Sequence, residues 1–208
     1  MTNSPDTIRE DDLKIPHAEA DMVIGLLGGS FNPPHEGHLH ISELALKRAK
    51  LDQVWWIVSP GNPLKDHSEL ASLGKRLRLC HDLARHPDIK ITAFEARFNV
   101  RYTEHTLSIL KKRRSRLKFV WLMGADNLAG FHKWRNWQGI AEMMPIIVID
   151  RPGSTLSYLS APAAIALSGY RVDETDVSRL AYMKPPAWTF LHGPRSLLSS
   201  TQIRRNRR

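Results

Sequence analysis

Two histidines spaced three residues apart lie within a run whose residue types suit phosphate binding. The run Gly-Gly-Ser-Phe-Asn-Pro-Pro-His-Glu-Gly-His-Leu-His covers residues 28–40 and contains His35 and His38. Imidazole N–H groups donate hydrogen bonds to phosphoryl oxygens whether the ring is neutral or charged. Gly28 and Gly29 allow tight backbone geometry with no side chain in the way of a ligand. These residues favour chemistry on a nucleotide.

The elements on either side of this run explain how it would be held. The apolar stretch over residues 22–27 has the pattern of a parallel strand that is buried on both faces. After the run, apolar residues recur at helical spacing over residues 41–49. A helix that starts near His38 directs unpaired N–H groups and the positive end of its dipole at a bound anion. The junction of strand, turn and helix therefore predicts an anion site.

Two other interpretations of the histidine pair are open at this point. The pair could bind a metal, but no Cys or third His stands at ligand spacing, and the His-Glu-x-x-His pattern of zinc hydrolases is missing. The run could also be a plain turn with incidental histidines, because short motifs often mislead. We assign no metal ligands among the side chains.

Motifs near both ends of the chain resemble the signature of the nucleotidyltransferases related to class I tRNA synthetases. The first is Gly-x-Phe-x-Pro-x-His-x-Gly-His over residues 29–38. The second is Ser-Ser-Thr-x-Ile-Arg over residues 199–204, an element that this family places across the triphosphate from the first motif. Both occur in the family's order and at about its separation, so coincidence is a poor explanation.

Three further matches resemble one branch of this family, the bacterial nicotinate mononucleotide adenylyltransferases. Residues 102–107 read Tyr-Thr-x-x-Thr-Leu, residues 124–128 read Gly-Ala-Asp-Asn-Leu and lead to Trp134 and Trp137, and residues 151–153 read Arg-Pro-Gly. The resemblance implies transfer of AMP from ATP to nicotinate mononucleotide in NAD biosynthesis, with nicotinate adenine dinucleotide and pyrophosphate as products.

The resemblance also implies roles for individual residues. The acceptor phosphate is an ionised nucleophile that needs no general base, so catalysis must come from holding two polyanions in line. We expect His38, His35 and Arg204 to be catalytic. The implied ATP site comprises Gly29, Ser30, Phe31, His35, His38, Gly124, Asp126, Ser200, Thr201 and Arg204, and the implied acceptor site comprises Thr103, Trp134, Tyr102 and Lys65. Mg²⁺, held mainly by phosphate and water, is the expected cofactor.

The chain alternates predicted strands and helices, which is typical of an α/β fold. Strands are predicted over residues 23–27, 54–58, 89–94, 118–123, 145–149 and 188–191, and helices over residues 38–50, 69–84, 104–114 and 127–133. An Ala-rich segment over residues 161–166 could add a short helix within a peripheral excursion. Thr103 and Asp126 are predicted helix N-caps. The pattern predicts a Rossmann-like, mainly parallel sheet with helices on both faces and ligands at the carboxyl ends of its strands.

Length, cysteine content and hydropathy set limits on the kind of protein. The 208 residues suit one core, so we predict a disordered tail over residues 1–20 and a single nucleotidyltransferase domain over residues 21–208. Cys80 is the only cysteine, so no disulfide can form within the chain. No run of about 18 apolar residues occurs. We expect a cytoplasmic protein with no membrane partner.

The net charge of +9 raises the question of nucleic-acid binding. The densest basic cluster, over residues 111–118, falls at the end of a predicted helix, where cations complement the dipole. No helix-turn-helix pattern or aromatic platform accompanies the charge, so we favour steering of anionic mononucleotides or simple solubility and expect no nucleic-acid partner. A nucleic-acid-binding module is the alternative from another class, and it would leave the two phosphate motifs unexplained.

Other enzymes of the same superfamily form a second alternative. An adenylyltransferase that acts on nicotinamide mononucleotide or phosphopantetheine would keep the ATP site and change the acceptor site. A class I synthetase fragment is disfavoured, because no Lys-Met-Ser-Lys-Ser element occurs. The sequence leaves open the choice between nicotinate and nicotinamide acceptors, and also the oligomeric state.

Overall fold

One six-stranded sheet runs through the computed structural model, which describes residues 7–61, 70–150 and 160–193. Its order is β3-β2-β1-β4-β5-β6, and every neighbouring pair is parallel. The strands are β1 Val23–Gly29, β2 Gln53–Val58, β3 Ile89–Thr92, β4 Lys118–Gly124, β5 Ile146–Ile149 and β6 Trp188–Leu191. This is the Rossmann-like arrangement that the alternating pattern predicts, and the predicted strand boundaries are correct to within two residues.

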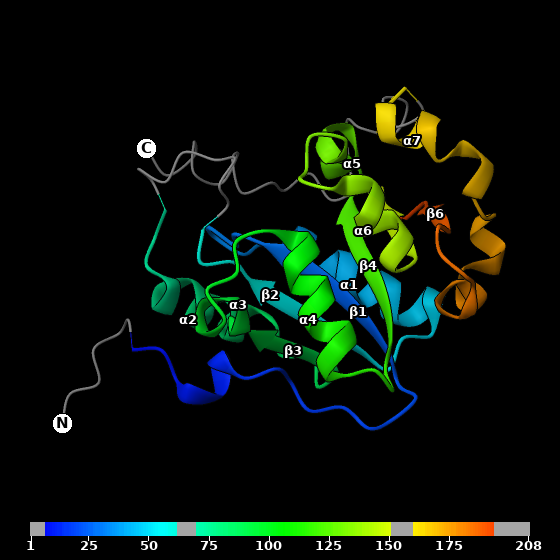
Figure 1. Cartoon of the computed structure of the whole chain (residues 1–208). Helices are drawn as coiled ribbons and strands as arrows, with labels where there is room; N and C mark the ends of the chain where they lie inside the picture. Colours follow the sequence, from blue (N-terminus) through cyan, green and yellow to red (C-terminus); the bar gives the residue numbers. More distant parts are fainter. Residues whose placement is uncertain (1–6, 62–69, 151–159, 194–208) are drawn as a thin grey trace.

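Helices cover both faces of the sheet (Figure 1). They are α1 Glu36–Ala49, α2 Leu73–Leu83, α3 Phe94–Arg97, α4 Thr103–Arg113, α5 Ala125–Phe131, α6 Trp137–Met143 and α7 Pro162–Ala166, with 3-10 segments η1 Glu10–Leu13, η2 Ser168–Tyr170 and η3 Glu174–Tyr182. The predicted helices correspond to α1, α2, α4 and α5, and the Ala-rich segment to α7. In the described ranges, no helix is long and apolar enough to cross a membrane.

The pleat of the strands divides the apolar residues between two cores. In β1, Ile24 and Leu26 pack on the face covered by α4, α5 and α6, whereas Val23 and Leu27 pack on the face covered by α1, α2 and η3. Strands that are buried on both faces read as continuous apolar runs, because neither side of the pleat meets water. This burial explains why residues 22–27 lack polar alternation.

The order of the strands reverses between β1 and β4, which are neighbours at the centre of the sheet. After β1 the chain turns toward β2 and β3, and after β4 it turns toward β5 and β6. Connections that leave in opposite directions open a space at the carboxyl ends of the two strands, where such sheets bind ligands. The fold therefore places the ends of β1 and β4 at the expected ligand edge.

Both outer strands are covered by irregular segments of the chain. On one edge, Thr92 Oγ1 in β3 donates to the Lys14 carbonyl at 2.7 Å, and the Ala93 N–H donates to the Asp12 carbonyl at 2.6 Å. On the other edge, the Val172 N–H donates to the carbonyl of Trp188 in β6 at 2.8 Å. Unpaired edges invite pairing with other chains, and these contacts cover part of each edge.

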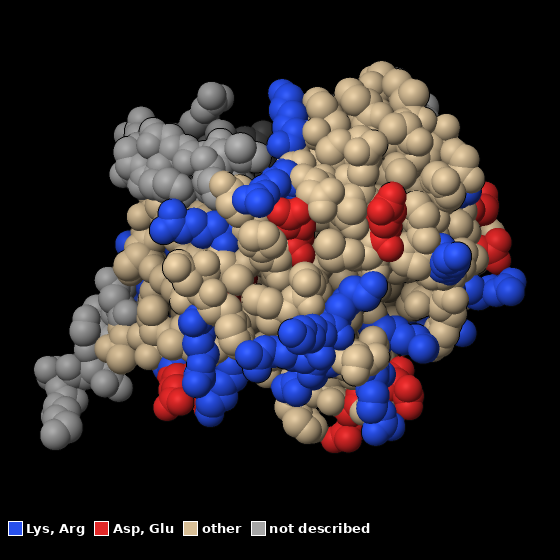
Figure 2. Space-filling model, viewed as in Figure 1, with Lys and Arg blue, Asp and Glu red and all other residues tan. Residues whose placement is uncertain are grey.

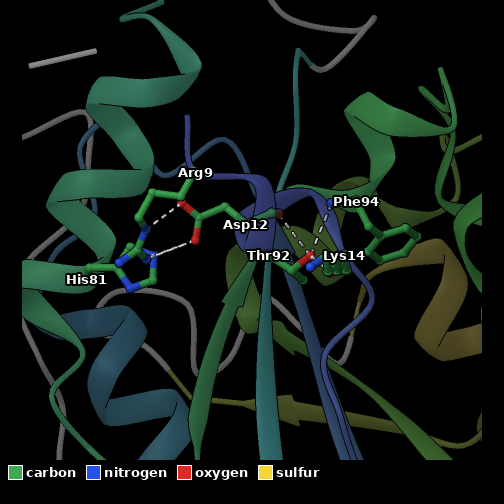
Figure 3. Close-up of polar contacts among 6 residues, drawn as sticks. All are labelled: Arg9, Asp12, Lys14, His81, Thr92 and Phe94. Atoms are coloured by element: carbon green, nitrogen blue, oxygen red, sulfur yellow. Dashed lines mark hydrogen bonds and ion pairs between the residues drawn. The ribbon is translucent and has the colours of Figure 1, made fainter. Parts of the chain in front are cut away.

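An ion-pair cluster anchors the N-terminal segment to α2 (Figure 3). Asp12 is 4% exposed, and its carboxylate accepts hydrogen bonds from Arg9 at 2.9 Å and from His81 Nε2 at 2.8 Å. Burial would raise the pKa of Asp12, but the hydrogen bonds from Arg9 and His81 lower it below its usual value. The expected disorder is therefore wrong for residues 7–20, because polar anchors hold a segment whose composition gave no sign of order.

We expect Asp12→Asn to destabilise the protein by about 1–3 kcal/mol at pH 7, because a neutral amide loses the charge-assisted hydrogen bonds of a buried carboxylate. The lowered folded-state pKa means that the carboxylate stabilises the fold above its unfolded-state pKa, and that this contribution disappears as the pH falls through the folded-state value. The difference in the free energy of unfolding between the variant and the parent protein should therefore shrink below about pH 4. Urea denaturation at pH 7 and pH 3 measures both effects.

The control variant is Asp11→Asn, since the neighbouring Asp11 side chain is 87% exposed in its ion pair with Lys14. An exposed pair of this kind contributes little to stability, because solvent screens it. Equal losses from Asp11→Asn and Asp12→Asn at pH 7 would contradict the anchoring role of Asp12.

Candidate active site

The two histidines of the phosphate motif hold the start of α1 by reciprocal hydrogen bonds. His35 is the N-cap, and its Nδ1 accepts from the Gly37 N–H at 3.1 Å. The His35 N–H in turn donates to Nδ1 of His38 at 3.2 Å. These side chains satisfy N–H groups that an uncapped helix start leaves without partners. The helix begins at Glu36, two residues before its predicted start at His38.

The same bonds determine which nitrogen of each neutral ring carries the proton. A ring nitrogen that accepts a hydrogen bond from a backbone N–H has no proton of its own, so the proton lies on Nε2 in both residues. The ring centroids of His35 and His38 are 3.9 Å apart. His35 is 4% exposed, and His38 is half-buried. Two adjacent Nε2–H donors at a helix N-terminus form an arrangement that suits anionic oxygens.

An aromatic cluster supports His38. The Phe31 ring is 1% exposed, stacks on Trp56 at 5.0 Å and lies 4.7 Å from the His38 ring. Trp56 Nε1 donates to Ser42 Oγ at 2.7 Å, and Ser42 Oγ donates to the His38 carbonyl at 2.8 Å. Phe31 has a φ of 47°, a left-handed conformation that is uncommon for an aromatic residue and is held here by the packing. The cluster brings Phe31 and His38 together.

Gly28 and Gly29 form the end of β1 instead of the predicted turn. A Cβ on Gly28 would lie 2.6 Å from the Trp121 ring, so only glycine fits at this position without a shift. The Trp121 ring meets the half-buried Trp134 edge-on at 6.3 Å, and Trp134 also packs on Phe131 at 5.4 Å. Trp121 thus connects the end of β1 to Trp134, a link that the sequence motifs did not reveal.

Tyr102 and Thr103 lie at the start of α4. Tyr102 is the N-cap, because its carbonyl accepts from two N–H groups of the first turn, so the predicted N-cap at Thr103 is wrong by one residue. The Arg135 guanidinium lies 4.7 Å from the centre of the Tyr102 ring, and Arg135 Nε donates to the buried Glu104 at 2.8 Å. Because Arg135 follows Trp134, these contacts join the start of α4 to the loop that carries Trp134.

The end of β4 lies beside the end of β1. Leu27 pairs with Leu122, so Gly29 and Gly124 end their strands at the same level. Gly124 is the N-cap of α5, which makes the predicted N-cap at Asp126 wrong. Asp126 is instead an exposed residue of the first turn of α5, where a carboxylate complements the positive end of the helix dipole.

The C-terminal motif and residues 62–69 of the loop after β2 fall outside the described residues, and with them Lys65, Ser200, Thr201 and Arg204. The chain leaves the described part at Gly193, which lies against α1. A Cβ on Gly193 would be 2.6 Å from Leu44 Cδ2 and 3.5 Å from His40 Nε2. Gly193, the last described residue before the second motif, therefore lies beside the helix that His35 caps.

Arg76 is a buried cation at the ligand edge that the sequence motifs did not identify. It belongs to α2, is 1% exposed and donates to the carbonyls of Ser30 at 2.6 Å and Ser59 at 2.7 Å. A signal for it exists in the sequence, because Arg76 falls within the helical stripe of apolar residues that includes Leu77 and Cys80. A charged residue at such a position is either misplaced or satisfied by specific partners.

A buried carboxyl group supports the start of α4. Glu95 in α3 is 8% exposed and accepts a hydrogen bond from Thr106 Oγ1 at 2.5 Å, and Thr106 lies one turn after Tyr102. Burial raises the pKa of Glu95 to about 7, although the bond from Thr106 acts in the opposite direction. Sequence reasoning missed Glu95, since a lone Glu in a short helix resembles an exposed residue.

The basic cluster lies away from this site. Figure 2 shows Lys and Arg side chains gathered over the C-terminal end of α4, where Lys111, Lys112 and Arg113 form the last turn. Lys111 Nζ donates to the Met143 carbonyl at 2.9 Å, and Arg113 lies 4.7 Å from the centre of the Phe98 ring. Because α4 starts at the carboxyl edge of the sheet and runs back to the start of β4, this cluster marks the opposite edge.

The fold and the site together define a nucleotide-binding α/β protein of the nucleotidyltransferase type. The cytidylyltransferase-like family matches residues 26–206. A Brucella suis protein named probable nicotinate-nucleotide adenylyltransferase is 58% identical over 184 residues, which cover 88% of this chain and 95% of that protein. A Rhizobium meliloti protein of the same name is 56% identical over 183 residues, which cover 88% and 97%.

Among solved structures, the fold is similar to that of Plasmodium falciparum nicotinic acid mononucleotide adenylyltransferase complexed with NaAD. The TM-score is 0.66 at 16% identity, and the match covers 88% of this chain and 83% of that one. The chain therefore belongs to the cytidylyltransferase-like family and, within it, to the nicotinate-nucleotide adenylyltransferases.

We expect Glu95→Gln to change how stability depends on pH. The folded-state pKa of about 7 lies above the ordinary value of 4.5, so the folded protein holds an extra proton between these values and loses stability as the pH rises through them. Glutamine keeps an oxygen that accepts from Thr106 and does not titrate. The variant should gain stability relative to the parent by up to about 1.4 kcal/mol per pH unit in this window.

Chemical denaturation at intervals from pH 4.5 to pH 8 measures the effect. Glu142→Gln in α6 is the control, because Glu142 is exposed. Parallel stability curves for Glu95→Gln and its parent would contradict the buried, protonated state of Glu95.

Proposed function

We propose that this protein transfers AMP from ATP to nicotinate mononucleotide, forming nicotinate adenine dinucleotide and pyrophosphate. The observation that carries the proposal is the pair of Nε2–H donors of His35 and His38 at the N-terminus of α1, on the carboxyl edge of β1. The names of the close relatives support the same reaction. The Plasmodium falciparum protein of similar fold forms a complex with NaAD, which is in keeping with this product.

The reaction needs alignment and charge stabilisation from the protein. A phosphate oxygen of the acceptor attacks the α-phosphorus of ATP, the bond from that phosphorus to the bridging oxygen breaks, and pyrophosphate leaves with the electron pair. The attacking phosphate is already ionised, so no side chain has to remove a proton. The protein must offset the repulsion between two polyanions and the charge that develops on the leaving group. His38 and His35 would serve this purpose through their Nε2–H groups.

The remaining ATP-binding residues follow from the position of the triphosphate. The backbone N–H groups of Ser30 and Phe31, which follow Gly29, would bind phosphate oxygens at the end of β1, and Asp126, after Gly124, would accept hydrogen bonds from the ribose hydroxyls. Ser200, Thr201 and Arg204 would bind the β- and γ-phosphates. Gly193 contacts α1, and about six further residues can span roughly 20 Å, so a return of the second motif to the triphosphate is within reach.

Mg²⁺ is proposed to arrive with ATP. Among the described residues, no three His, Cys, Asp or Glu side chains gather in a group that could hold a metal ion. Mg²⁺ binds triphosphate oxygens and retains several waters, so one or two protein ligands are sufficient. When bound, the cation would neutralise part of the triphosphate charge.

Trp134, Thr103 and Tyr102 are proposed to bind the acceptor, together with Lys65. The Trp134 ring would stack on the pyridine ring, and Thr103 with backbone N–H groups at the start of α4 would bind its carboxylate. The contacts of Arg135 with Tyr102 and Glu104 support this assignment, because they hold the two segments together. N–H donors would discriminate against the amide of nicotinamide by being left mismatched.

We expect His38→Ala to lower kcat about 100-fold or more, because it removes a donor aimed at charge that develops in the transition state. His38→Asn separates this role from helix capping: its side-chain oxygen can accept from the His35 N–H, but it offers no Nε2–H. Both variants should lose kcat, and the asparagine variant should keep more of the folding stability. A pyrophosphate-release assay with ATP and Mg²⁺ provides the measurement.

The assay should offer nicotinate mononucleotide, nicotinamide mononucleotide and phosphopantetheine in parallel. His17→Ala is the control variant, because the His17 side chain is 84% exposed in the N-terminal segment. Turnover only with another acceptor would refute the proposed substrate. Near-normal kcat in His38→Asn would remove His38 from the mechanism.

A further inference from the structure

Arg76 holds three backbone segments at the ligand edge with a single buried side chain. Its guanidinium donates to the Ser30 carbonyl at 2.6 Å, the Ser59 carbonyl at 2.7 Å and the Pro60 carbonyl at 3.4 Å. Its Nε donates to the Ala71 carbonyl at 3.0 Å. These partners follow β1, follow β2 and precede α2, so one planar fork connects the loops that border the site.

The charge of Arg76 is not neutralised by a carboxylate within the described ranges, because all of its hydrogen bonds there go to carbonyl oxygens. Burial lowers the pKa of Arg76, but an arginine in a protein stays protonated. Buried charges are normally paired, and a buried cation that lacks a counter-ion costs stability. A triphosphate at this edge would supply a negative charge, which the described partners of Arg76 do not provide.

The contact with Ser30 also fixes the direction of an N–H group. In a trans peptide unit the C=O and N–H bonds point in opposite directions. The Ser30 carbonyl points toward buried Arg76, so the N–H of the same peptide unit, which belongs to Phe31, points away from Arg76. The Gly29 carbonyl likewise accepts from the Ser59 N–H at 2.9 Å, which turns the Ser30 N–H away from β2.

A second contact ties the same loop to the start of α2. Asn32 Oδ1 accepts from the Ala71 N–H at 3.1 Å, while the Ala71 carbonyl accepts from Arg76. Both polar groups of residue 71 are therefore used to hold the loop that follows β1. Among the described residues the Phe31 N–H donates to no backbone carbonyl.

We propose that Arg76 is a positioning residue for ATP, which orients the Ser30–Phe31 peptide so that its N–H meets a phosphate oxygen and places a positive charge behind it. The inference rests on the proposed function, because it assumes that a triphosphate binds at the start of α1. Arg76 acts through the backbone and through its field, and it does not touch the substrate. This role explains why a cation occupies a position in an apolar helical stripe.

The test compares Arg76→Lys and Arg76→Gln with Arg78→Gln, a control on the exposed side of the same helix. Titration calorimetry with ATP and Mg²⁺, in the absence of acceptor, measures ATP binding directly. Steady-state kinetics then give kcat and separate KM values for ATP and nicotinate mononucleotide. Urea denaturation reports the stability of each variant.

We expect Arg76→Gln to lower kcat/KM for ATP by roughly 10- to 100-fold, because misplacement of a phosphate-binding group by about 1 Å has effects of this size. The KM for nicotinate mononucleotide should change less than threefold, because no hydrogen bond of Arg76 within the described ranges goes to the segments that carry Tyr102, Thr103 and Trp134. Arg76→Lys retains the charge without the planar fork, so its loss should be intermediate. Arg78→Gln should behave as the parent protein.

The outcomes separate the two proposals. Failure of the parent protein to bind ATP or to release pyrophosphate would refute the proposed function itself. A parent protein that turns over, with folded Arg76 variants of unchanged ATP affinity and kcat/KM, would overturn the role of Arg76 alone. Equal losses for ATP and acceptor, or unfolding of both Arg76 variants, would show that Arg76 serves the fold and not the ATP site.

Discussion

The two hydrogen bonds by which the His35 and His38 rings cap α1 are the interaction on which the site depends. Each ring accepts a backbone N–H at Nδ1, so the side chains that cap α1 are also the side chains whose Nε2–H groups are proposed to meet a ligand. Capping and anion binding are thus compatible at one helix start. His38 is held in place by two further contacts. Its ring lies against the stack of Phe31 and Trp56, and its carbonyl accepts from Ser42, which in turn accepts from Trp56.

In the backbone after β1, buried groups likewise bind the carbonyl oxygens, which fixes the direction of the N–H groups of the same peptide units. Arg76 and Ser59 bind the carbonyls of Ser30 and Gly29 on the inner side, so the corresponding N–H groups point the other way. Such an arrangement suits a reaction between two polyanions, because fixed donors need little rearrangement when charge shifts during the reaction. Packing also explains the glycine at position 28, because Trp121 fills the space that a Cβ at Gly28 would need.

The sequence predicted the sheet well, because strands buried on both faces and helices with an apolar stripe leave clear periodic patterns. The spacing of His35 and His38 predicted an anion site, and the structure brings both rings together at the start of α1. Thr103 and Asp126 were misassigned as N-caps, because Tyr102 and Gly124 cap through the backbone and carry no side-chain signal. Long-range partners were beyond prediction, because Arg76, Glu95 and Arg135 contact segments that are distant from them in the sequence. All catalytic and ligand-binding assignments stay predictions, and Lys65, Ser200, Thr201 and Arg204 also lie outside the described residues.

The covered edges of the sheet restrict how this protein can associate with copies of itself. The segment around Asp12 occupies part of the outer side of β3, and Val172 occupies part of the outer side of β6. A continuous intermolecular sheet would first require one of these segments to detach, with the loss of the ion pairs of Asp12 in one case. Homo-oligomers of this chain should consequently be built from helical surfaces, and fibrillar growth by strand addition should be suppressed in the folded state.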